Sequence, residues 1–254
     1  MNEALRGIVA DLKAATLFAT RLPLRHDAAI GGTDIARASW ALPAVGVLIG
    51  LLSAIAYWLA CYLRLPPFVC AALAVAASLI ATGGLHEDGL ADTGDGLGGG
   101  TRERKLEIMR DSRIGTYGAC ALALSLLLRI SALASLPGPL PAALALVAAH
   151  AGARAPLPLF LALVPPARTD GLAADAGRPP AVRAAIALVI GAVLLVMTLG
   201  GTRSFAAVLL LAAAFAALRS LALRQLGGQT GDVAGALEQV GEIGVLLAAA
   251  ADPG

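Results

Sequence analysis

Residues 43–63 read PAVGVLIGLLSAIAYWLACYL, and this run contains no charged side chain. A helix needs about 20 apolar residues to cross a hydrocarbon core roughly 30 Å thick. The run therefore predicts a membrane-spanning helix. The other structure that can span a bilayer is a closed barrel, whose strands alternate apolar and polar side chains, and a continuous run of Ala, Leu, Val and Ile argues against it.

Similar runs recur along the chain of 254 residues. We predict six spans, at 43–63, 68–85, 115–136, 140–164, 183–199 and 204–223. A further apolar run, 243–251, is too short to cross alone. A helix that ends there and begins near Val233 would either cross or re-enter, and the sequence leaves both open.

The overall composition agrees with a membrane protein. Hydrophobic residues make up 58% of the chain, and charged residues 14%, against about 25% in soluble domains. We therefore expect one all-α domain, residues 1–254, built as a polytopic helical bundle of about six to seven transmembrane helices in a lipid bilayer. The basic residues are scattered or interleaved with acids, which argues against nucleic-acid binding.

The N-terminal segment, residues 1–25, lacks the small-residue cleavage site of a removable secretory signal. Its apolar side chains fall roughly on one side of a helix, opposite Arg6, Asp11 and Lys13. This pattern predicts an amphipathic helix at the membrane interface.

Lys and Arg concentrate in alternate connections between the predicted spans, at residues 6–37, 102–113, 168–183 and 219–224. Short loops rich in these residues stay on the cytoplasmic side. The acidic segment 86–113 and the polar segment 227–242 are therefore expected on one cytoplasmic face, where they could form one site.

The chain's acidic residues are clustered, since seven of the 17 lie between Glu87 and Asp111. Residues 86–100 read HEDGLADTGDGLGGG, with Asp88, Asp92 and Asp95 at positions i, i+4 and i+7. On a helix these carboxylates share one face and span roughly 10 Å. Like charges so placed need compensation, and hard oxygen ligands indicate Mg²⁺ or Mn²⁺ together with a diphosphate substrate. The alternative is a solvated loop whose Asp residues cap helices.

Neighbouring polar residues extend this candidate site. His86 adjoins the acids and could act as a base, a hydrogen-bond donor or an orienting group. Residues 102–118 read RERKLEIMRDSRIGTYG, in which Arg110, Asp111, Ser112 and Arg113 lie at the predicted membrane boundary. Arginine there can hold phosphate oxygens in a fork, so we predict a substrate role for these residues.

Two further polar groups lie elsewhere in the chain. His150 and Arg154 are four residues apart inside a predicted span, so they either line the site or form a structural pair. Residues 227–242 read GGQTGDVAGALEQVGE, where Thr230 or Asp232 either caps the next helix or contacts ligand. We include Thr230, Asp232, Glu238 and Arg154 among the candidate substrate-binding residues.

Segments 86–100, 102–118 and 227–242, together with TRLP at 20–23 and LPAVG at 42–46, resemble the cobalamin synthase family, the adenosylcobinamide-GDP ribazoletransferases. The resemblance implies a multi-pass enzyme of the inner membrane whose active site faces the cytoplasm. It implies that adenosylcobinamide-GDP and α-ribazole, or its 5′-phosphate, are joined with Mg²⁺ and that GMP is released. Asp88, Asp92 and Asp95 would then hold Mg²⁺, and His86 or Glu87 would accept the proton.

Two other interpretations remain. A different membrane transferase acting on a metal-bound diphosphate, such as a CDP-alcohol phosphotransferase or an aromatic prenyltransferase, also uses spaced aspartates. A cation transporter would place its carboxylates near the bilayer midplane, whereas these lie at the end of a span beside basic residues. Whether the chain forms a homo-oligomer stays open.

Overall fold

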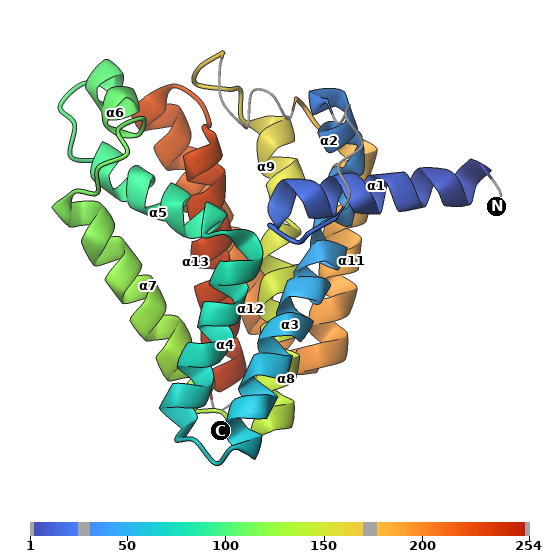
Figure 1. Ribbon diagram of the computed structural model, residues 1–254. Helices are drawn as coiled ribbons and strands as arrows, with labels where there is room; N and C mark the ends of the chain where they lie inside the picture. Colours follow the sequence, from blue (N-terminus) through green and yellow to red (C-terminus); the bar gives the residue numbers. More distant parts are fainter. Residues whose placement is uncertain (1–2, 25–30, 170–176, 252–254) are drawn as a thin grey trace.

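The computed structural model describes residues 3–24, 31–169 and 177–251, and most of them lie in helices (Figure 1). Of the basic segments named above, residues 25–30 and 170–176 lie outside the described part. The first helices are α1 (Glu3–Ala19), α2 (Gly32–Ala38), the short turn η1 (Ser39–Ala41), α3 (Leu42–Tyr62), α4 (Pro67–Thr82), α5 (Leu85–Gly96) and α6 (Arg102–Ile108). The remainder are α7 (Thr116–Ala134), α8 (Pro139–Arg154), α9 (Leu157–Leu163), α11 (Ala181–Leu199), α12 (Gly201–Leu221), η2 (Ala222–Leu226) and α13 (Gly231–Ala250).

Six helical segments of the described chain are long and apolar enough to cross a membrane, as the all-α polytopic prediction requires. They are Gly32–Tyr62, Thr116–Ala134, Pro139–Leu163, Ala181–Leu199, Gly201–Leu226 and Gly231–Ala250. The C-terminal helix, left open by the sequence, is therefore long enough to cross as α13. The span predicted at 68–85 is not one straight helix. Helix α4 ends at Thr82, and α5 continues at an angle of 91°, so this part of the chain is a seventh span only if the bent pair is counted as one.

The bend between α4 and α5 has a local cause. Gly83 and Gly84 both adopt the left-handed backbone region, with φ values of 69° and 70°. Two consecutive residues in this region end a right-handed helix, and glycine adopts it without the steric cost of a Cβ. The bend turns α5 away from the direction of α4 and carries its acidic residues across the bundle towards α13 (Figure 1).

Helices α8 and α13 form the centre of the bundle. In the span formed by α8 and α9, 78% of the most apolar stretch is buried inside the protein. The corresponding share is 22% in α11 and 28% in α7. The outer helices expose large apolar side chains such as Leu124 on α7 and Val189 on α11, as expected of surfaces that face lipid. Helix α3 packs closely against α8 at Gly46, where a Cβ would lie 2.3 Å from the carbonyl oxygen of His150. Small residues allow such close backbone contact in membrane bundles.

Helix α1 lies across one end of the bundle (Figure 1). Leu5, Ile8 and Val9 are exposed, in agreement with an interfacial helix. Asp11, predicted on the polar outer side, is instead buried, because its carboxylate accepts hydrogen bonds from Arg37 Nε at 2.8 Å and from Trp40 Nε1 at 2.9 Å. These bonds attach α1 to α2 and η1.

The close contact of α3 with α8 can be tested by adding one methyl group. We expect Gly46→Ala to lower the free energy of unfolding by about 1–3 kcal/mol, because the new Cβ meets backbone that cannot move aside. The matched control is Gly201→Ala, where nothing lies within 4 Å and no loss is expected. Thermal unfolding of both variants in detergent gives the comparison, and equal stabilities would contradict this account of the packing.

Candidate active site

The acidic segment meets the C-terminal helix where α5 crosses α13. A Cβ on Gly89 would lie 2.8 Å from the carbonyl oxygen of Asp232, and one on Gly235 would lie 3.3 Å from Cα of His86. Two glycines facing each other therefore let the backbones of α5 and α13 touch. Of the two segments expected to share one face, residues 86–96 on α5 therefore contact residues 231–242 on α13.

The crossing gathers four carboxylates, Asp88, Asp92, Asp95 and Asp232, which we call the acidic face. Asp92 lies within electrostatic range of the other three and of the Arg168 guanidinium. Arg168 Nη2 is 3.4 Å from Asp232 Oδ2. Asp88 is exposed and Asp92 partly exposed, so a ligand arriving from solvent can reach them. Carboxylates outnumber guanidiniums here, which suits a divalent cation bound through oxygen.

Asp95 caps a helix, the role that the sequence left open as the alternative to binding a metal. Its two carboxylate oxygens accept hydrogen bonds from the backbone N–H groups of Gly115, at 2.7 Å, and Gly118, at 2.8 Å. Gly115 is the N-cap residue of α7 and Gly118 lies in its first turn, so Asp95 caps that helix. A Cβ at either glycine would lie within 2.5 Å of the carboxylate, which explains why glycine stands at both positions.

The predicted phosphate-binding residues lie on the loop that precedes α7. Arg113 is exposed and its Nη2 is 2.6 Å from Asp111 Oδ2 of the same loop. Hydrogen bonds from Arg113 hold the pKa of Asp111 at about 2, so this carboxylate stays ionised at neutral pH. Arg110 and Ser112 are exposed as well. Their role towards phosphate stays a prediction.

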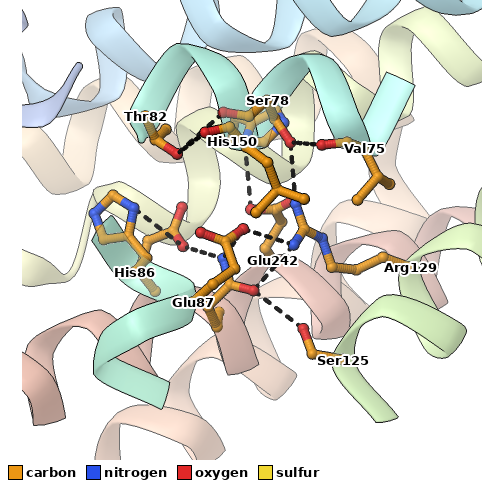
Figure 2. A network of polar contacts seen from close by, with 12 residues as sticks. Val75, Ser78, Thr82, His86, Glu87, Ser125, Arg129, His150 and Glu242 are labelled. Carbon is orange, nitrogen blue, oxygen red and sulfur yellow. Dashed lines mark hydrogen bonds and ion pairs between the residues drawn. The ribbon is translucent and has the colours of Figure 1, made fainter. Parts of the chain in front are cut away.

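Beneath the acidic face lies a buried charge network, shown in part in Figure 2. Its members are each at most 7% exposed: His86, Glu87, Arg129, His150, Arg154, Glu238, Gln239 and Glu242. Arg129 is its centre, because its guanidinium lies 2.8 Å from oxygens of both Glu87 and Glu242. It also donates to Gln239 Oε1 at 3.1 Å and to Ser78 Oγ at 3.2 Å.

The second half of the network surrounds Arg154. Its Nη1 lies 2.5 Å from Glu238 Oε1 and donates to the carbonyl oxygen of His150 at 2.9 Å. His86 Nδ1 is 3.7 Å from Glu238 Oε2, and His150 Nδ1 is 3.3 Å from Glu242 Oε2. The network therefore joins α5 to α4, α7, α8 and α13. Buried charges of this kind persist only when paired, and removing one partner is costly.

The ligating atoms of His150, Glu238 and Glu242 lie within 4.8 Å of one another, which is the spacing of a metal site. Their carboxylates, however, are already paired with Arg129 and Arg154. Two guanidiniums at contact distance repel a cation. The acidic face is therefore the better candidate for a metal.

The polar residues of segment 227–242 have three different surroundings: a helix cap, the acidic face and the buried charge network. Thr230 caps α13, since its hydroxyl oxygen accepts a hydrogen bond from the Val233 N–H at 3.3 Å. Asp232 belongs to the acidic face, whereas Glu238 is buried against Arg154.

The family model for cobalamin-5-phosphate synthase matches residues 11–250, which include every element of the site. The chain belongs to this family. A protein of Bradyrhizobium diazoefficiens named adenosylcobinamide-GDP ribazoletransferase is 54% identical over 251 residues, covering 98% of this chain and 96% of the relative. A protein of Mesorhizobium japonicum with the same name is 52% identical over 245 residues, covering 96% and 94%. No solved structure matches the chain.

Membership of the cobalamin-5-phosphate synthase family confirms the resemblance seen in the three sequence segments. The sequence did not reveal the buried network, although a signal for it existed. His150 and Arg154 are four residues apart on α8. The acidic residues Glu238 and Glu242 have the same spacing on α13, so the two basic groups can each face an acidic group where these helices pack together.

The capping role of Asp95 predicts a loss of stability in its absence. Asp95→Ala should lower the free energy of unfolding by about 1–2 kcal/mol, because two N–H groups of α7 lose their acceptor. Glu103→Ala on the exposed surface of α6 is the matched control and should stay within ~0.5 kcal/mol of the unaltered protein. Thermal unfolding in detergent measures both, and an Asp95→Ala protein as stable as the control would contradict the cap.

Proposed function

We propose that the chain transfers the adenosylcobinamide phosphoryl group from adenosylcobinamide-GDP to α-ribazole or its 5′-phosphate, releasing GMP. The observation that carries this proposal is the match to the cobalamin-5-phosphate synthase family over residues 11–250. The relatives named adenosylcobinamide-GDP ribazoletransferase support the two substrates. The acidic face, which opens to solvent at Asp88, supports a reaction at a diphosphate, because such a substrate brings negative charge that carboxylates can meet only through a cation.

The proposed metal is Mg²⁺, and the donors of the acidic face fit it. They are hard oxygen atoms from α5 and α13. The Arg168 guanidinium is the cation that acts on Asp92. We propose Asp88 and Asp92 as ligands and add Asp232, which the crossing of the helices brings beside them. Asp95 remains a proposed ligand, because each of its carboxylate oxygens accepts one hydrogen bond from the start of α7 and keeps a second lone pair. When bound, Mg²⁺ would neutralise charge that develops on the diphosphate oxygens.

In the proposed step a ribose hydroxyl of α-ribazole attacks the phosphorus that carries the corrinoid arm. The bond from that phosphorus to the oxygen of GMP breaks, and the hydroxyl proton passes to a base. We propose His86 or Glu87, the two residues that precede Asp88 on α5, for this base. Arg110 and Arg113 on the neighbouring loop would hold phosphate oxygens.

We also propose that the reaction faces the cytoplasm of a cell whose inner membrane holds the protein. Loops rich in Lys and Arg support this orientation, since α6 and the loops around it share the end of the bundle with the acidic face. Cation transport is the weaker proposal, because the carboxylates deep in the bundle are paired with Arg129 and Arg154.

Release of GMP by the purified full-length protein in detergent tests the proposal, with adenosylcobinamide-GDP, Mg²⁺ and either α-ribazole or its phosphate. We expect Asp88→Asn and Asp92→Asn to lower kcat by at least about a hundredfold, since each loses a ligand charge. Chelation of Mg²⁺ should abolish turnover of the unaltered protein. Glu107→Gln, on the exposed side of α6, is the control and should retain full activity.

Normal turnover by folded Asp88→Asn and Asp92→Asn proteins would contradict the metal assignment. Absence of GMP release from the unaltered protein, under conditions where it remains monodisperse, would contradict the function itself.

A further inference from the structure

A cavity of about 350 Å³ lies where the loop after α9 meets the start of α13. Ligand pockets of small molecules measure roughly 300–1,000 Å³. Among the described residues, its lining is mostly apolar, and Gln229 and Arg178 supply the polar groups. Pro165 and Pro166 offer flat apolar surface next to these groups, so the lining suits a planar ring with polar edges.

The backbone holds the polar groups of this cavity in place. The N–H of Gln229 donates to the carbonyl oxygen of Pro165 at 2.8 Å, and the N–H of Ala167 donates to the carbonyl oxygen of Gln229 at 2.8 Å. A Cβ on Gly228 would lie 2.4 Å from the Pro165 oxygen, so only glycine permits this approach. Arg178 is fixed in turn, because its Nε donates to the carbonyl oxygen of Ala162 at 2.7 Å.

Gln229 carries an unused hydrogen-bonding atom. Gln229 lines the cavity and is only 3% exposed, yet its Oε1 accepts no hydrogen bond from the described residues. A buried acceptor without a donor costs free energy, and such atoms in native proteins call for an explanation. A ligand N–H that reaches this atom would supply the missing donor.

The cavity also lies next to the acidic face. Gln229 and Asp232 are three positions apart in the chain, so their Cα atoms are at most about 11 Å apart. Arg168 follows the cavity-lining stretch at Pro165 and Pro166, and its guanidinium contacts Asp232. A ring held against Gln229 can therefore extend a phosphate chain past Arg168 to the acidic face.

We propose that this cavity binds the guanine of the nucleotide substrate, an inference that rests on the function proposed above. Guanine presents N1–H and an exocyclic amino group, both of which can donate to Gln229 Oε1. Its O6 and N7 accept, and Arg178 is a donor beside them. The benzimidazole of α-ribazole has no N–H to offer. Adenine offers one donor, its exocyclic amino group, and no N–H at N1, so it can give Gln229 Oε1 one hydrogen bond where guanine can give two. The cavity therefore selects the leaving nucleotide and orients its diphosphate towards Asp88 and Asp92.

Binding of GMP to the full-length protein in detergent, measured by titration calorimetry with AMP as the matched ligand, tests this proposal. The unaltered protein should bind GMP at least about tenfold more tightly than AMP, the factor expected of one hydrogen bond. Gln229→Leu should remove this preference. Gln225→Leu is the control, because it makes the same change on η2, outside the cavity, and should retain the preference.

Turnover gives a second readout. Gln229→Leu should raise KM for adenosylcobinamide-GDP about tenfold and leave KM for α-ribazole unchanged. Equal affinity of the unaltered protein for GMP and AMP would overturn the proposal even if the variant fails to fold. A higher KM for α-ribazole alone would overturn it too.

These outcomes separate the cavity from the reaction. GMP preference without turnover would leave the cavity assignment intact and contradict only the proposed function. Turnover without any preference for GMP would contradict the cavity assignment and leave the proposed function intact.

Discussion

The ion pairs of Arg129 with Glu87 and Glu242 hold α5, α7 and α13 in one arrangement, and the acidic face depends on that arrangement. Glu87 and Asp88 are neighbours on α5, so the helix presents one carboxylate to the buried network and the next to solvent. Buried charges are stable only when paired in good geometry. The network therefore fixes the rotation of α5 about its axis and, with it, the direction in which Asp88 and Asp92 point.

Glycine makes this arrangement sterically possible. The left-handed pair Gly83 and Gly84 turns α5 out of line with α4, and Gly89 facing Gly235 lets α5 touch α13. Asp95 then secures the far end of α5 against α7 through the N–H groups of Gly115 and Gly118. The site is thus built on rigid helices, and the exposed carboxylates lie between two fixed ends.

The sequence could predict most of the spans because hydropathy is a local property. It could place Asp88, Asp92 and Asp95 on one side of a helix because i, i+4, i+7 spacing is local as well, whereas Asp232 joins them only through the contact of α5 with α13. It could not predict the bend after Thr82, since an apolar run looks continuous whether or not two glycines adopt positive φ. The role of Glu87 was hidden for a similar reason, because its partner Arg129 is 42 residues away. Asp95 satisfied the ligand spacing while its cap of α7 depended on a contact across 20 residues.

The central claim is that pairing between Arg129 and Glu87 fixes α5 in the bundle. A double-mutant cycle on unfolding in mixed micelles tests it most directly, using Arg129→Met, Glu87→Gln and the combined variant. The account predicts a coupling free energy above about 1 kcal/mol, because each single change leaves a buried polar partner unpaired. Additivity of the two changes within ~0.5 kcal/mol would contradict it.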